Sequence, residues 1–220
     1  MSTALEAVGF FLCVASWLII GTSLANDYWR VSSYHGSVIV SNRQYENLWH
    51  SCAEDSTGIA NCRDFESLLA LPGYIQACRA LMVIALLLGL VSTIMSIMGL
   101  KCIKLGSTTE QGKARIAVTG GILFILAGLC VMTACSWYAS RIVEEFNNPM
   151  FGGTRFEPGA GLYIGWAGGI LAMLGGSMMC CACKRASAGG AGGGYPGHAG
   201  KSQVYKPTPM SDPASVRNYV

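Results

Sequence analysis

Charged residues are scarce in this chain. Asp, Glu, Lys and Arg make up 12% of its 220 residues, whereas soluble domains contain about 25%. The shortage is concentrated in four apolar runs without any charged residue, each close to the ~20 residues that a helix needs to cross a bilayer. Because a backbone in lipid must satisfy its own hydrogen bonds, the pattern predicts four transmembrane helices. The runs are 8–24, 80–100, 116–138 and 161–183.

No Asp, Glu, Lys, Arg or His lies in the interior of these runs. Such groups usually mark ion pathways and proton relays inside membranes, so transport through the helix bundle is disfavoured. The sequence also lacks a phosphate-binding loop, a nucleophile elbow and a metal-binding helix motif. We therefore expect no enzyme activity, no cofactor and no metal. The overall charge of +3 reflects topology and gives no reason to expect a nucleic-acid partner.

Basic residues are missing before the first run, which disfavours a cleaved signal peptide. Segment 101–115 has four basic residues and one acidic residue, a net +3, and segment 184–220 has five and one, a net +4. The remaining loops, 27–79 and 141–160, have six basic and nine acidic residues, a net −3. The positive-inside rule therefore predicts two cytosolic termini and two extracellular loops in a multi-pass plasma-membrane protein.

Besides Cys78, which lies near the membrane interface, the long outer loop contains two of the ten cysteines, Cys52 and Cys62. They bracket the sequence Asp-Ser-Thr-Gly at 55–58, which is typical of a tight turn. Two strands joined by that turn would bring the sulfurs within bonding distance. Disulfides persist outside the cell, so we predict a Cys52–Cys62 bridge; the alternative is a pair of unrelated free thiols.

The two outer loops are expected to form a small antiparallel β-sheet, which gives a membrane α+β fold with a four-transmembrane-helix bundle over residues 1–185. A short helical turn at 65–71 should end at the Pro-Gly pair that follows. The third helix is expected to continue outside the membrane through 141–146. Strands are predicted at 28–34, 37–41, 45–52 and 60–64, with an edge strand contributed by 151–156.

The segment 186–220 is rich in Gly, Ala, Ser and Pro and is expected to be a disordered cytosolic tail. It ends in Tyr219-Val220, an apolar last residue with a free carboxylate that PDZ domains capture by strand addition. Four cysteines border the membrane on this side, where palmitoylation is common. Inert thiols and a zinc site are the alternatives, although no clean C-x-x-C pair is present. These cysteines are Cys102, Cys180, Cys181 and Cys183.

The long outer loop carries a signature tryptophan, an Asn-Leu-Trp triplet, two cysteines and an arginine at the head of the second helix, which are Trp29, Asn47, Leu48, Trp49, Cys52, Cys62 and Arg79. With these residues the sequence resembles the claudin family, and by eye it is nearest the channel-forming claudins ten and fifteen. The resemblance covers about residues 5–185 and the last two residues.

The resemblance implies a tight-junction protein that polymerises with itself and other claudins, in cis and in trans, and binds PDZ scaffold proteins, membrane lipids and inorganic ions. Facing sheets would line a paracellular channel or barrier. Departures from the family pattern at Asn147, Phe156 and Pro158 bear on polymer strength. The matching positions imply a pore and selectivity role for Asp55, Asp64 and Phe65, cis-assembly through Leu68 and Phe146, and second-loop contacts by Pro149, Met150 and Phe156.

Two interpretations of the charges stay open. A carboxylate at Asp55 in a narrow aqueous pore would favour cations, or it is simply a solvated surface charge. If Arg43 and Arg63 face the lumen instead, the protein would pass anions or mainly seal. Arg79 either anchors the second helix at the interface or caps carbonyls of the sheet, as the resemblance implies. A tetraspan adhesion or accessory protein that neither polymerises nor conducts is the remaining hypothesis.

Overall fold

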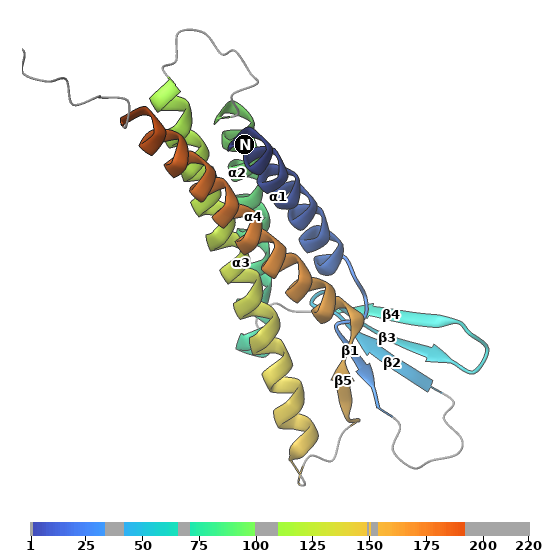
Figure 1. Cartoon of the computed structure of the whole chain (residues 1–220). Helices are drawn as coiled ribbons and strands as arrows, with labels where there is room; N and C mark the ends of the chain where they lie inside the picture. Colours follow the sequence, from blue (N-terminus) through green and yellow to red (C-terminus); the bar gives the residue numbers. More distant parts are fainter. Residues whose placement is uncertain are drawn as a thin grey trace, which may run out of the picture.

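Four long helices form an elongated bundle with a β-sheet at one end (Figure 1). The computed structural model describes residues 2–33, 42–65, 71–99, 110–148, 150 and 154–191. Each helix is long and apolar enough to cross a membrane, which confirms the four predicted spans. The helices are α1 (Ser2–Leu24), α2 (Gly73–Gly99), α3 (Glu110–Asn147) and α4 (Ala160–Ala191).

The bundle is held together by close packing of α4 on α1 and on α3, and of α3 on α2. Glycines allow the α3–α4 approach. A Cβ added at Gly121 would lie 2.8 Å from the carbonyl oxygen of Gly176, and one at Gly128 would lie 2.8 Å from that of Gly169. Small residues at such crossings let backbones meet closely, which is the packing expected between helices in lipid.

Two charged side chains are buried near the end of the bundle opposite the sheet. Glu6, on α1, is 3% exposed, and Lys113, on α3, is 7% exposed. The sequence analysis placed the first span at 8–24, which left Glu6 outside it. Because α1 begins at Ser2, Glu6 is part of the helix instead.

The sheet has five antiparallel strands in the order β4-β3-β2-β1-β5. The first four come from the long loop. The last comes from the short loop and pairs with β1, which confirms the predicted edge strand, although it begins at Phe156, where the predicted segment 151–156 ends. The sheet therefore joins the α1–α2 loop and the α3–α4 loop into one unit. The strands are β1 (Arg30–Ser32), β2 (Asn42–Glu46), β3 (His50–Asp55), β4 (Ala60–Asp64) and β5 (Phe156–Pro158).

The predicted strand at 45–52 is wrong, because a turn divides it between β2 and β3. The amide oxygen of Asn47 accepts hydrogen bonds from the backbone N–H groups of Trp49 (2.7 Å) and His50 (2.8 Å). An Asn side chain that binds the backbone two and three residues ahead stabilises a turn rather than an extended strand. The expected strand at 28–34 is also shorter, and segment 37–41 and most of the helical turn at 65–71 lie outside the described residues.

Helix α3 continues past the apolar run to Asn147, as predicted. Helix α4 ends at Ala191, so residues 186–191 are helical rather than part of a disordered tail.

The junction between sheet and bundle is built around Trp29, whose side chain is fully buried. Its indole N–H donates to the carbonyl oxygen of Ser23 (2.8 Å), and its ring meets Tyr138 edge-on at 5.3 Å. The backbone N–H groups of Gly159 and Gly161 donate to the carbonyl oxygens of Trp29 (2.9 Å) and Tyr28 (2.7 Å). The start of α4 is thus attached directly to the start of β1.

Substitution of Gly159 by Ala should destabilise this junction. The added Cβ would lie under 3.0 Å from the backbone of Tyr28, which cannot rotate away. We expect a loss of roughly 1–3 kcal/mol in the free energy of unfolding, measured as a lower thermal unfolding midpoint in detergent. Gly21→Ala is the control, because nothing lies within 4 Å of the added atom there. Equal midpoints for both variants would contradict this account.

Candidate functional site

The Asn-Leu-Trp triplet is fastened to the head of α2 by Arg79. The Nε–H of Arg79 donates to the carbonyl oxygen of Leu48, and the guanidinium lies 4.9 Å from the ring centre of Trp49. The ring centre of Phe65 lies 5.7 Å from the same guanidinium. Arg79 therefore caps a carbonyl of the loop, and the interpretation in which it only anchors α2 at the interface is incomplete.

The predicted disulfide is present between Cys52 and Cys62, which face each other across β3 and β4. The turn between them also matches the sequence: the Gly58 N–H donates to the carbonyl oxygen of Asp55 (2.8 Å), and Gly58 has a positive φ of 78°. His50 lies with the two sulfurs within 4.8 Å. Because the sulfurs are bonded to each other, this group offers no pair of thiolates to a metal.

Asp55 is exposed at the tip of the β3–β4 hairpin. Its carboxylate accepts hydrogen bonds from the backbone N–H and hydroxyl of Ser56. Asp64 lies at the opposite end, facing His50 across the ladder. Five residue steps of strand separate the two ends, roughly 17 Å. One chain therefore does not bring the two predicted selectivity carboxylates together; it places them at opposite ends of the hairpin.

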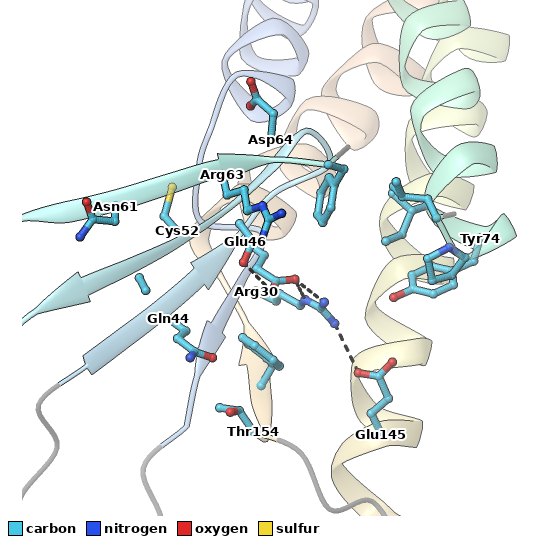
Figure 2. A pocket seen from close by; sticks show the side chains of 17 residues that line it. Arg30, Gln44, Glu46, Cys52, Asn61, Arg63, Asp64, Tyr74, Glu145 and Thr154 are labelled. Atoms are coloured by element: carbon cyan, nitrogen blue, oxygen red, sulfur yellow. Dashed lines mark hydrogen bonds and ion pairs between the residues drawn. The ribbon is translucent and has the colours of Figure 1, made fainter. Parts of the chain in front are cut away.

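A groove of about 880 Å³ lies between the sheet and the outer ends of α2 and α3 (Figure 2). Strand alternation places Gln44, Glu46 and Ser51 on the face toward it. By the same alternation, Asp55 is on the groove face and its neighbour Glu54 is on the other face. The charged residues that line the groove are Arg30, Glu46, Arg63, Asp64 and Glu145.

Arg30 is at the centre of this groove and joins the sheet to α3. Its Nε donates to Glu46 (2.7 Å) and a terminal nitrogen donates to the same carboxylate oxygen, while the other terminal nitrogen lies 3.4 Å from Glu145. The ring of Phe156 lies 4.5 Å from the guanidinium. Burial acts to lower the pKa of Arg30, but Tyr138 and Glu46 together raise it above its ordinary value. Arg30 therefore stays charged.

The sequence analysis did not identify Arg30, Glu46 and Glu145 as a cluster. They are far apart in the chain and come from three elements, so no local spacing connects them. A second cluster was also missed: the Asn47 side-chain amide and the His50 imidazole lie 3.1 and 3.0 Å from one carboxylate oxygen of Asp27. This cluster connects the exit of α1 to the turn between β2 and β3.

Two of the predicted contact residues face inward and one faces outward. Phe146 is half-buried at the end of α3, with the Arg155 guanidinium 5.6 Å from its ring. Phe156 packs within the chain under Arg30, whereas Met150 is 92% exposed. At the end of the bundle away from the sheet, Cys181 is exposed and Cys180 is half-buried. Leu68, Pro149, Cys102, Tyr219, Val220 and the side chain of Cys183 lie outside the described residues.

These features together define a class: a four-helix membrane protein whose two outer loops form one disulfide-linked sheet. A family model described as the PMP-22/EMP/MP20/Claudin family matches residues 1–179. The match covers most of the chain, which therefore belongs to this family.

Within the family, the chain is similar to claudins over most of its length. Mouse claudin-15 is 45% identical over 98% of this chain and 95% of that protein. Bovine claudin-15 is 49% identical over 84% of this chain and 80% of that protein, and human claudin-19 is 47% identical over 83% and 82%. The chain is a claudin of tight junctions, and claudin-15 was one of the two claudins that it resembled by eye.

Replacement of Arg79 by Lys should destabilise the fold although the charge is kept. A lysine lacks the planar fork that reaches the Leu48 carbonyl while stacking on Trp49. A buried acceptor left without its partner costs roughly 1–3 kcal/mol. The thermal unfolding midpoint in detergent should fall accordingly. Arg155→Lys is the matched control, because that guanidinium is exposed; a similar midpoint for the two variants would show that the cap is not required.

Proposed function

We propose that this claudin polymerises into tight-junction strands with itself and other claudins, in cis and in trans, and forms cation-selective paracellular channels. Both termini would lie in the cytosol and the sheet would lie between cells. The proposal rests on family membership and on one observation: an exposed carboxylate, Asp55, at the tip of a hairpin whose geometry is fixed by the Cys52–Cys62 disulfide.

A carboxylate in this position suits cation selection. Within the part of the chain that the structure describes, no Lys or Arg forms an ion pair with Asp55. Rings of Asp or Glu select cations in channels because they replace part of the hydration of the ion and repel anions. The Debye length is about 8 Å at physiological ionic strength, so only a charge close to the narrowest point has this effect.

The extracellular cations, by contrast, are mostly engaged. Arg30 is paired with Glu46 and Glu145, and Arg141 is paired with Glu144 at 2.5 Å. Arg79 is occupied by a carbonyl and two rings. Engaged guanidiniums have their positive charge partly cancelled or buried, which leaves the exposed carboxylates to dominate the field that an ion meets.

An anion-selective or sealing claudin is the second candidate, and Arg63 favours it. Arg63 pairs with Ser51 in the ladder and lines the groove on the same face as Glu46. Arg43 does not add to it: the register places Arg43 on the other face, with its guanidinium 5.8 Å from the ring of Tyr28. This alternative therefore depends on Arg63.

A third candidate is a tetraspan adhesion or accessory protein that does not polymerise. Freeze-fracture of cells that express this chain alone separates it from the first two, because only a polymerising claudin gives continuous strands.

The first candidate also needs contacts between molecules. Met150, 92% exposed on the short outer loop, supports a contact with another molecule. Cis-assembly through Leu68 and Phe146, with second-loop contacts at Pro149, Met150 and Phe156, completes the polymer proposal.

On the cytosolic side we propose a PDZ scaffold partner for Tyr219-Val220 and palmitoylation near the membrane. The apolar span of α4 ends at Ala182, and exposed Cys181 is within two residues of that end. An acyl chain there would enter the inner leaflet. Cys102, Cys180 and Cys183 are the other candidate sites.

Replacement of Asp55 by Asn should reduce the sodium-to-chloride permeability ratio of an epithelial monolayer that expresses this chain and few other claudins. Removal of one charge at a few ångströms from a hydrated ion predicts a decrease of about two- to threefold. Dilution potentials measure the ratio. The matched control is Glu54→Gln, which removes the same charge from the adjacent residue on the opposite face of β3.

The outcomes separate the candidate functions. A lower ratio for Asp55→Asn with an unchanged ratio for Glu54→Gln supports the cation channel. A chloride preference in the unmodified chain supports the second candidate and makes Arg63 the residue to replace. Higher resistance without selectivity identifies a sealing claudin, and equal effects of the two substitutions would remove Asp55 from the mechanism.

A further inference from the structure

We propose that the Cys52–Cys62 disulfide is a modification site for small thiols such as glutathione, which attack it at Cys62 and release Cys52 as the free thiol. The two cysteines differ in access: Cys62 is exposed, whereas Cys52 is only 1% exposed. Exposed disulfides are the labile ones in proteins, and the rate of exchange depends on which sulfur the attacking thiolate reaches. This reaction goes beyond the proposed channel and does not depend on it.

A row of side chains on one face of the sheet explains the difference in access. Residues paired across antiparallel strands share a face. Taken from β4 to β1, the register gives the row Cys62, Cys52, Tyr45 and Val31. Cys62 stands at the open end of this row, because β4 is the outermost strand among the described residues and all five of its residues are exposed.

The direction of attack follows from this row. One thiolate displaces another along the line of the S–S bond, so it approaches a sulfur from the side opposite the bonded partner. For Cys62 that side is the outer edge of β4. For Cys52 it is the side of β2, where Tyr45 lies; this side chain is 7% exposed, and its ring centre is 4.7 Å from that of Tyr28. Tyr45 therefore shields Cys52, and the open approach is at Cys62.

The exchange is balanced in atoms and electrons. The glutathione thiolate forms a new S–S bond to the sulfur of Cys62, the Cys52–Cys62 bond breaks, and its electron pair leaves on Cys52, which takes up a proton from water. Glutathione is oxidised to the mixed disulfide and Cys52 is reduced. A ring nitrogen of His50 lies within 4.8 Å of both sulfurs, which gives the departing thiolate a polar neighbour.

Opening the bond would loosen the tip of the β3–β4 hairpin. Apart from the strand ladder, the tip is closed by two backbone hydrogen bonds, from the Asp55 N–H to the Ile59 carbonyl oxygen (3.0 Å) and from the Gly58 N–H to the Asp55 carbonyl oxygen (2.8 Å). The Asp55 carboxylate would then be held less firmly. This consequence rests on the proposed function: thiolation should lower the sodium-to-chloride permeability ratio by at most the about two- to threefold expected for Asp55→Asn.

The experiment treats the full chain in detergent with glutathione, stops the exchange with acid, and locates the adduct by tandem mass spectrometry of the tryptic peptide 44–63. In the folded protein the adduct on Cys62 should exceed that on Cys52 about tenfold or more. The matched control is the same chain unfolded in denaturant with its disulfide intact, where the two adducts should be similar. Equal adducts in the folded chain, an excess on Cys52, no adduct, or the same Cys62 excess in the unfolded chain would each overturn the inference.

Two variants test the shielding directly. Tyr45→Ala opens the second approach and should raise the Cys52 adduct toward the level at Cys62, whereas Tyr45→Phe keeps the ring and should keep the Cys62 preference. An unchanged preference in folded Tyr45→Ala would overturn the shielding; if that variant does not fold, the comparison of folded and unfolded chain still decides. Dilution potentials without glutathione test the channel separately: absence of cation preference would refute the proposed function and leave the position of the adduct unaffected.

Discussion

The burial of one indole, that of Trp29, is the constraint on which the position of the sheet depends. Its N–H is satisfied by the last turn of α1, its ring packs against α3, and its backbone accepts a hydrogen bond from the start of α4. Three helices thus meet at the first residue before β1. Because a buried N–H without a partner is costly, the indole fits only one arrangement of these elements, and the sheet takes its position from it.

Arg79 and Arg30 extend this constraint in two directions. Arg79 fixes the turn at Leu48 to α2, and Arg30 links β1 and β2 to α3. Both use a guanidinium because its planar fork can bind several acceptors and stack on aromatic rings at once. The consequence for function is electrostatic: the cations that hold the sheet in place are also removed from the field of the groove, while carboxylates at its edges remain solvated.

The helices and the hairpin could be predicted from the sequence because their signals are local. An apolar run of about twenty residues specifies a span, and the Asp-Ser-Thr-Gly turn between two cysteines specifies a cross-strand bridge. The division of 45–52 into two strands was missed because it depends on the Asn47 side chain rather than on β-propensity. The Arg30, Glu46 and Glu145 cluster was missed for a different reason: its members come together only through tertiary packing.

The Arg30–Glu145 contact affects both the position of the sheet relative to α3 and the charge of the groove. The same carboxylate that joins the sheet to α3 also cancels one positive charge on the surface that ions would pass. A stronger pair, in which two nitrogens of Arg30 donate to the carboxylate as they do at Glu46, would fix the sheet more firmly but would bury the charge. The longer 3.4 Å contact leaves that charge exposed. The tight pairing with Glu46 therefore holds Arg30 in place, and the longer contact with Glu145 adds a weaker link between the sheet and α3.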